Sequence, residues 1–200
     1  MNEKFFDLKK EKQDRMLNAA LKIFAQNGYA HASTDDIVKE AGISKGLLFH
    51  YFTNKIGLYT FLYDFSARFI ELEMTSSVDR SDNDYFSIHL MLKKAETNVM
   101  KMYPYMVSFI NSCEKEDIIE ALSVVSDKKD IVPNCVEEIF KHANTMLIKN
   151  DVDQSKLTEI VNFTSAAVME KVLKENPERP EQYFEDMKDY LILLKNACYR

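Results

Sequence analysis

The eight residues from Lys45 to Phe52, KGLLFHYF, bring an ammonium group, an imidazole and a phenol onto one short stretch of chain. Leu48 and Phe52 are four residues apart, so on a helix they share one face and can pack against a core. The other faces then carry Lys45, Gly46, Leu47, Phe49, His50 and Tyr51. Such a set is unusual on a surface that meets only water. We therefore expect these residues to face a binding partner.

The residues before this helix predict another short helix and a tight turn. Ser33, followed three residues later by Asp36, is typical of a capping box, so a helix should begin at about Thr34. Gly42 ends it, because glycine adopts positive φ without steric cost, and Ser44 follows as the next N-cap. Two helices joined in this way are the pattern of a helix-turn-helix, which places its second helix in a groove of DNA.

Single residues of the second helix allow more than one interpretation. Lys45, at its start, could reach O6 or N7 of a guanine. Gly46 is unfavourable inside a helix by about 1 kcal/mol relative to alanine, and it suits a backbone that approaches a ligand closely. Alternatively, Phe49 and Tyr51 pack on the neighbouring helix and His50 is merely a surface residue. The arrangement as a whole is more specific than any one of its members.

A first helix is predicted from about Lys10 to Asn27, where Gly28 ends it. Its apolar stripe would close a three-helix core over the helix-turn-helix. Four lysines near its start could act as a basic arm, namely Lys4, Lys9, Lys10 and Lys12. Alternatively, this terminus is frayed and solvated, because acidic residues interleave with the lysines.

The net charge of −6 is divided unevenly along the chain. Residues 1–60 hold nine Lys and Arg against seven Asp and Glu, which gives +2, whereas residues 61–200 carry −8. The basic excess therefore lies where the helix-turn-helix lies. Because +2 is modest, DNA binding would depend on a few placed phosphate contacts and on doubling by dimerisation.

From about residue 12 to residue 60 the chain resembles the DNA-binding domain of the TetR family of transcriptional repressors. The matching features are an amphipathic first helix ending in Phe24, Asn27, Gly28 and Tyr29, then Thr34 and Ile37, AGISKG, the run Phe49 to Phe52, and Asn54 and Lys55. The resemblance covers roughly the first third of the chain.

The resemblance implies that the third helix reads the major groove of DNA. The positions that would face DNA are Lys45, Gly46, Leu47, Phe49, His50 and Tyr51. Thr34 and Lys55 match positions that touch phosphates. Many members carry a tyrosine where this chain has Phe49, so a phosphate contact made by that hydroxyl is not carried over.

Beyond residue 55 the sequence pattern predicts further helices. The stretch from Lys55 to Met74 predicts a long fourth helix that links the DNA-binding head to another domain, with Gly57 near its start either weakening the helix or allowing close packing. Further helices are expected at 85–103, 105–113 and 116–127, from Pro133 to about residue 148, at 154–174, and from about Pro180. We therefore expect an all-α protein, with a helix-turn-helix domain at residues 1–55 and a helical ligand-binding and dimerisation domain at residues 56–200.

The last two helices, within residues 154–198, carry more apolar surface than one core-facing stripe needs, which implies a second partner surface. The resemblance implies that these helices pair with their copies as a four-helix bundle in a homodimer. Alternatively, they are fully buried within one subunit.

Methionine and aromatic residues are frequent in the C-terminal part of the chain. In a sensor they would line an apolar pocket for a small-molecule effector, since methionine adapts its shape and rings offer large contact areas. The candidates are Tyr63, Phe69, Met102, Tyr103, Tyr105, Met106, Phe109, Phe140 and Phe163. The alternative is that these residues are simply core.

Neither catalysis nor a metal site is indicated. The four histidines show no metal-ligand spacing, the three cysteines are widely spaced without a C-x-x-C, and no Gly-rich phosphate loop or G-x-S-x-G occurs. We expect no cofactor. Without a long apolar run or a cleavable leader, we expect no membrane span and a reduced, cytoplasmic compartment.

Together these patterns predict a ligand-responsive transcriptional regulator, most simply a repressor. It would bind a pseudo-palindromic DNA operator as a homodimer and be released by a small-molecule effector of unknown identity. The alternative is a helical binding or interaction protein, or an enzyme, whose head no longer binds DNA.

Overall fold

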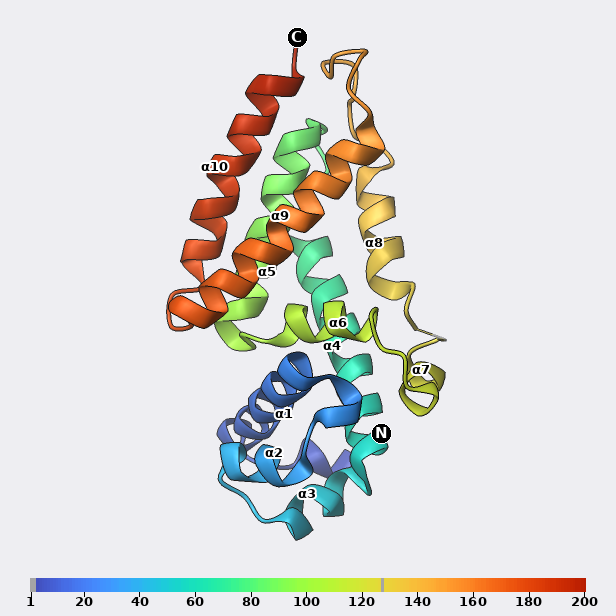
Figure 1. Cartoon of the computed structure of the whole chain (residues 1–200), viewed down its shortest axis with the longest axis vertical. Helices are drawn as coiled ribbons and strands as arrows, with labels where there is room; N and C mark the ends of the chain where they lie inside the picture. The colour runs from blue at the N-terminus through green and yellow to red at the C-terminus, as the bar shows by residue number, and fades with distance from the viewer. Residues whose placement is uncertain (1–2, 127) are drawn as a thin grey trace. The chain divides into compact units, whose positions relative to one another are not determined.

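The computed structural model describes residues 3–126 and 128–200, and within these ranges the chain forms ten α-helices and one short 3-10 helix (Figure 1). The elements are η1 Glu3–Phe5, α1 Lys10–His31, α2 Thr34–Ala41, α3 Lys45–Phe52, α4 Lys55–Ser77, α5 Tyr85–Met102, α6 Met106–Cys113, α7 Ile119–Val125, α8 Ile131–Phe140, α9 Gln154–Glu175 and α10 Glu181–Cys198. The predicted all-α class is confirmed. None of these described helices is long and apolar enough to cross a membrane.

The chain divides into two compact units. Unit 1 contains Met1–Phe69 and Met102–Val132, and unit 2 contains Ile70–Lys101 and Pro133–Arg200. Helix α4 therefore contributes its first part to unit 1 and its last part to unit 2. This division places α6 and α7 in the same unit as the helix-turn-helix. The domain boundary predicted at residue 55 separates two functions rather than two packed units, so it stays a prediction.

The core of unit 1 is built on α1, which packs against α2 and α6. Its buried apolar residues recur at helical spacing, as predicted, and include Leu17, Leu21 and Phe24. Gly28 breaks the helical geometry with φ 66°, a conformation that only glycine adopts without steric cost. The regular part of α1 thus ends at the predicted place.

The N-terminal segment is anchored in unit 1 through Phe5. Its side chain is buried, and its ring lies 5.1 Å from that of Phe52 and 5.3 Å from that of Phe61, measured between centroids. This contact fixes η1 against α3 and α4. The N-terminal segment, for which a basic arm and a frayed end were the two expectations, is therefore packed against unit 1 through Phe5.

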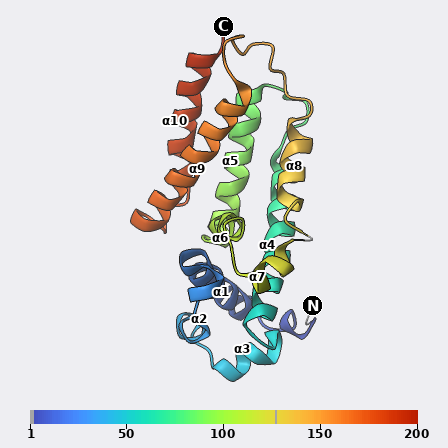
Figure 2. The same cartoon turned by 45° about the vertical axis from the view of Figure 1, so that its right-hand side comes forward.

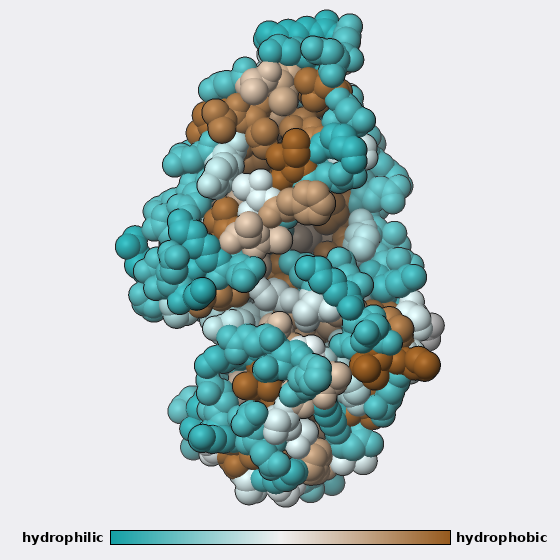
Figure 3. Space-filling view, viewed as in Figure 1, coloured by the Kyte–Doolittle hydropathy of each residue, from teal (hydrophilic) through white to brown (hydrophobic). Residues whose placement is uncertain are grey.

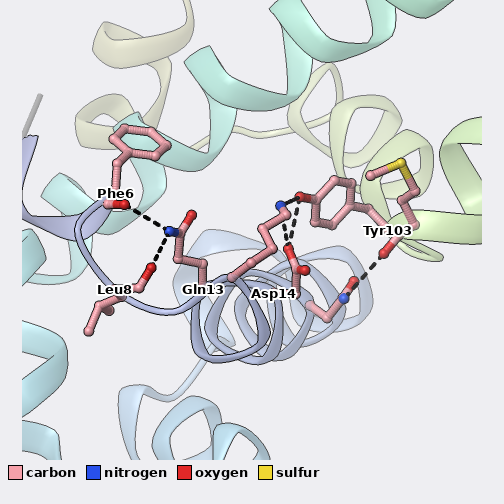
Figure 4. A network of polar contacts seen from close by, with 8 residues as sticks. Phe6, Leu8, Gln13, Asp14 and Tyr103 are labelled. Carbon is pink, nitrogen blue, oxygen red and sulfur yellow. Dashed lines mark hydrogen bonds and ion pairs between the residues drawn. The ribbon is translucent and has the colours of Figure 1, made fainter.

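Polar contacts hold the next residues of the N-terminal segment (Figure 4). The amide of Gln13 donates to the carbonyl oxygens of Phe6, at 3.1 Å, and Leu8, at 2.7 Å. Lys10 Nζ lies 2.7 Å from a carboxylate oxygen of Asp14 and 2.9 Å from the hydroxyl of Tyr103. Of the four candidate arm lysines, Lys10 therefore serves an intramolecular contact.

Unit 2 is formed by α5, α8, α9, α10 and the end of α4, with α9 and α10 side by side (Figure 2). A buried polar network joins three of these helices. Lys93 of α5 bonds both carboxylate oxygens of Glu96, at 2.8 and 3.0 Å, and its ammonium lies 3.0 Å from the hydroxyl of Ser165 on α9. The hydroxyl of Tyr183 on α10 bonds Ser165 at 2.6 Å and also donates to Glu96. Because every member has a partner, the burial cost of the charges is offset.

Two predicted helices differ from the structure. Helix α8 begins at Ile131, two residues before Pro133, and ends at Phe140 rather than near residue 148. The backbone N–H of Asn144 instead donates to the carbonyl oxygen of Asn83 at 2.7 Å, so a contact distant in sequence replaces the helical bond. The segment expected to be helical at 116–127 contains only the shorter α7, and residue 127 lies outside the described residues.

Candidate nucleic-acid interface

Helices α2 and α3 form the predicted helix-turn-helix, and their bounds are those expected from their caps. The hydroxyl of Ser33 accepts from the backbone N–H groups of Asp35 and Asp36 at 3.2 and 3.4 Å. Gly42 lies in the left-handed region, φ 64° and ψ 42°, and closes the end of α2. The hydroxyl of Ser44 then accepts from the backbone N–H of Leu47 at 3.2 Å and starts α3.

Helix α3 buries one side and leaves another open. Leu48 and Phe52 are buried, as their spacing predicts, whereas Lys45, Gly46 and His50 are exposed. A Cβ built on Gly46 would meet no atom within 4 Å in the described chain. The exposed side of α3 therefore begins with a positive charge beside an open stretch of backbone.

The remaining candidates on α3 are half-buried. They are Leu47, Phe49 and Tyr51. The ring of Tyr51 lies 5.8 Å from that of Phe5 and 5.0 Å from that of His50, between centroids. Tyr51 thus uses part of the α3 surface within the chain, through a ring contact with the N-terminal segment.

Lys45 is paired with Asp35 across the turn. Its ammonium lies 2.8 and 3.0 Å from the two carboxylate oxygens, and both side chains are largely exposed. An exposed pair of this kind contributes only about 0–1 kcal/mol, so a phosphate or a base edge could displace the carboxylate at little cost. No local sequence pattern indicates this pair, because the two residues are ten positions apart and on different helices.

The turn between α3 and α4 fixes the position of Lys55. Thr53 has φ 66°, and the N–H of Asn54 donates to the carbonyl oxygen of Phe52 at 2.7 Å. The side-chain oxygen of Asn54 accepts from the N–H of Gly57 at 2.8 Å and caps the first turn of α4. Lys55, the first residue of α4, is therefore held next to the end of α3.

The side chain of Lys55 is itself held against the end of α1. Its ammonium lies 4.6 Å from the ring centroid of Tyr29 and donates to the carbonyl oxygen of Ala30 at 3.3 Å. Burial lowers the pKa of Lys55 below its ordinary value, while the nearby carboxylates of Glu120 and Glu116 act in the opposite direction. The other residue expected to touch a phosphate, Thr34, is half-buried at the first position of α2.

The predicted effector-pocket residues differ in burial and are divided between the two units. In unit 1, Tyr63, Tyr103, Met106 and Phe109 are buried, Phe69 and Tyr105 are half-buried, and Met102 is exposed. In unit 2, Phe140 is half-buried and Phe163 is 71% exposed. Tyr103, for example, packs its ring on Phe69 and bonds Lys10 and Asp14 through its hydroxyl. Such contacts make most of the unit 1 members part of its core.

Unit 2 contains a cavity of about 310 Å³ that the aromatic pattern did not indicate. Its lining comes from α4, the connection to α5, the start of α5, α8, and His142 just after α8. The lining residues are Glu71, Thr75, Val78, Arg80, Asp82, Asn83, Ile88, Cys135, Glu138, Ile139 and His142. Most are polar and lie at helix ends or in a loop, so no apolar periodicity marks them in the sequence.

Comparisons with known proteins agree with this geometry. Residues 16–60 match the sequence model of the family described as "Bacterial regulatory proteins, tetR family". The uncharacterized HTH-type transcriptional regulator YxaF of Bacillus subtilis is 31% identical over 85 residues, which are 42% of this chain and 44% of the relative. YuxN, a second uncharacterized HTH-type regulator of Bacillus subtilis, is 41% identical over 59 residues, 28% of this chain and 20% of the relative. The aligned region thus spans less than half the length of either relative.

Solved structures resemble the chain over nearly its full length. A TetR family transcriptional regulator from Chloroflexus aurantiacus has a TM-score of 0.65 at 19% identity, covering 99% of this chain and 98% of its own. The TetR family protein CprB from S. coelicolor has a TM-score of 0.59 at 16% identity, covering 92% and 88%. Identities this low show the fold alone. Residues 16–60 therefore match the tetR family of bacterial regulatory proteins, and the chain shares the fold of solved TetR family regulators.

Proposed function

We propose that the protein is a DNA-binding transcriptional regulator that represses its target by occupying a pseudo-palindromic operator as a homodimer. The observation that carries this proposal is the open side of α3, where the exposed Lys45 precedes a glycine with free space above its backbone. A helix of this kind can enter the major groove of DNA. The DNA-contacting set is Thr34, Lys45, Gly46, Leu47, Phe49, His50, Tyr51 and Lys55, within a functional head at residues 1–55.

Dimerisation through α9 and α10 is supported by their exposed apolar side chains. Ile160 and Phe163 on α9, and Tyr190, Ile192 and Leu193 on α10, are all more than two-fifths exposed. Figure 3 shows apolar side chains along the course of α9 on the visible face of unit 2. Pairing of these helices with their copies would remove this surface from water. Two heads on one dimer would then contact half-sites about 34 Å apart, one turn of the duplex.

A small-molecule effector would release the operator by binding residues 56–200. The cavity of unit 2, about 310 Å³ in volume, offers a space for such a ligand. A ligand shifts the equilibrium only if it binds the conformation that does not bind DNA more tightly. A coupling of about 1–3 kcal/mol would weaken operator binding by roughly 5- to 150-fold. A cytoplasmic location suits both proposed partners, the operator DNA and the small-molecule effector.

The test is a gel-shift titration of DNA from immediately upstream of the protein's own gene, at low and at moderate salt. The proposal predicts a shifted complex that weakens as salt rises and that Lys45→Ala impairs. The exposed Lys39 lies on α2, and Lys39→Ala serves as the matched loss of one positive charge outside α3. Absence of any shift at low salt would favour the alternative, a helical binding protein or an enzyme without DNA binding.

The direction of regulation needs a separate experiment. FasR of Mycolicibacterium smegmatis, 39% identical over 49 residues, is named a transcriptional activator. A reporter gene behind the bound DNA should therefore be assayed with and without the protein. Repression predicts lower output with the protein present, and higher output would overturn that part of the proposal.

A further inference from the structure

Two carboxylates hold Tyr29 at the end of α1: Glu116, from the connection between α6 and α7, and Glu120, from the first turn of α7. The phenolic hydroxyl of Tyr29 donates to Glu120 at 2.7 Å, and its backbone N–H donates to Glu116 at 2.9 Å. Tyr29 is buried. Charge-assisted hydrogen bonds of this length are among the stronger polar contacts in proteins. We call residues 114–120 the acidic segment.

The carboxylate of Glu116 is held in turn by the backbone of the residues that follow it. Its second carboxylate oxygen accepts from the N–H groups of Asp117 and Ile118, each at 3.2 Å. One carboxylate therefore joins the end of α1 to the start of α7. All these residues belong to unit 1. A shift of the acidic segment would consequently be felt at Tyr29.

The ring of Tyr29 is also the surface on which Lys55 rests, with its ammonium 4.6 Å from the ring centroid. A phenol that donates to a carboxylate has a more electron-rich ring, which attracts a cation more strongly. The carboxylates thus act on Lys55 in two ways: by charge, and by keeping the ring in place beneath it. Neither route involves the base-facing side of α3.

We propose that Tyr29 is a positioning residue for the DNA phosphate contact of Lys55, and that Glu116 and Glu120 hold Tyr29 for this purpose. The inference rests on the proposed function, because it takes Lys55 as a phosphate-binding residue. It makes the acidic segment a control point for the affinity of the head toward DNA of any sequence. Preference between sequences is left unchanged, since phosphate contacts carry no base information.

The first experiment measures binding of the full chain to a short duplex of random sequence as salt is varied. Tyr29→Phe keeps the ring and removes only the hydroxyl. It should weaken binding about three- to tenfold with an unchanged salt slope, because the charge of Lys55 remains. Lys55→Ala should lower the slope by about 0.9 per subunit. In the Lys55→Ala background, Tyr29→Phe should have no further effect.

The matched control is Tyr59→Phe. Tyr59 belongs to the same aromatic cluster, with its ring 5.0 Å from that of Tyr29, but its hydroxyl donates to Cys113 at 3.0 Å. This control should leave DNA affinity as it is. Equal losses in Tyr29→Phe and Tyr59→Phe, or an undiminished Tyr29→Phe effect in the Lys55→Ala background, would overturn the proposal.

A second measurement needs no DNA. The side-chain methylene next to the Lys55 ammonium should have upfield NMR signals from the Tyr29 ring current. Glu120→Ala removes the acceptor of the Tyr29 hydroxyl and should move these signals toward their position in free lysine, whereas Glu114→Ala truncates an exposed residue of the same segment and should not. Signals that stay in place in Glu120→Ala refute the positioning role by themselves. If the unmodified protein did not bind DNA at all, that result would instead refute the proposed function.

Discussion

Gly57 lies so close to Phe52 that a Cβ on residue 57 would be 2.2 Å from the carbonyl oxygen of Phe52. No real Cβ makes such a contact with backbone, so the backbone itself would have to move. Of the two roles that the sequence left open for Gly57, the structure assigns close packing. The approach of α4 to the end of α3 therefore requires glycine at this position.

Gly57→Ala should destabilise the protein by about 1–3 kcal/mol, the usual cost of forcing an extra carbon into a packed site. Chemical denaturation followed by circular dichroism would measure the free energy of unfolding. DNA binding should weaken as well, because Lys55 is held by the same turn. Unfolding at the same denaturant concentration as the unmodified protein would contradict the close contact.

Gly46→Ala should behave in the opposite way. Its Cβ would stand in open space, and alanine favours a helix by about 1 kcal/mol over glycine, so stability should stay the same or rise. DNA affinity should fall at least tenfold if the backbone of α3 must approach the duplex. The same two assays, run on both glycine variants, would separate a packing glycine from a binding glycine. Unchanged affinity in Gly46→Ala would remove this part of α3 from the interface.

The ion pair between Lys45 and Asp35 gives a third prediction. Asp35→Asn should strengthen DNA binding about two- to tenfold, because it frees the ammonium of Lys45 and removes a negative charge beside it. Asp36→Asn is the matched control, since Asp36 lies next in sequence and is also exposed. Quantitative gel shifts at two salt concentrations would compare the variants. An equal effect of both would show that only net charge matters.

The helix-turn-helix could be predicted to the residue because its limits are set by local chemistry. Ser33, Gly42 and Ser44 each act on backbone groups within a few residues, so the sequence contains the whole cause. The end of α8 could not be predicted in the same way. It depends on Asn144 bonding to Asn83, which are far apart in the chain.

The candidate site was predicted only in part for the same reason. The residues on α3 follow from periodicity, but the partners of Lys45 and Lys55 do not. Tyr29 meets carboxylates 87 and 91 residues away, and no local pattern signals such a contact. For the effector pocket, aromatic content could not separate core residues from ligand-binding ones, because a large apolar side chain packs equally well in a core and beside a ligand.

The proposed dimer surface gives a fourth prediction, based on two leucines of α10. Leu193 is 66% exposed, whereas Leu191 is 1% exposed. Leu193→Asp should leave the subunit folded but bury a charge at the dimer interface, which costs several kcal/mol. Sedimentation should show monomers, and DNA affinity should fall although the head is intact.

Leu191→Asp is the contrasting variant, because it places the charge inside unit 2. It should lower the free energy of unfolding by several kcal/mol and reduce helix content. Circular dichroism would distinguish this outcome from simple dissociation. A dimer that persists in Leu193→Asp would show that α10 does not form the interface.

The final prediction concerns pH and His89. This histidine is buried in unit 2, with its ring 4.6 Å from that of Phe140 and 4.8 Å from that of Tyr85. Burial, with a smaller contribution from the charge of Lys93, lowers the pKa of His89 from 6.5 to about 3. Between these values the unfolded chain binds a proton that the folded chain does not. Stability should therefore fall as pH decreases below about 6.5, by up to about 1.4 kcal/mol per pH unit.

Denaturation curves at pH 5, 6, 7 and 8 would test this dependence on His89. His89→Gln should unfold at a lower denaturant concentration at neutral pH, yet its stability should lose less on acidification than that of the unmodified protein. His142→Gln, at an exposed histidine, controls for the loss of an imidazole as such. An acid dependence that is the same in His89→Gln and in the unmodified protein would mean that other groups cause it.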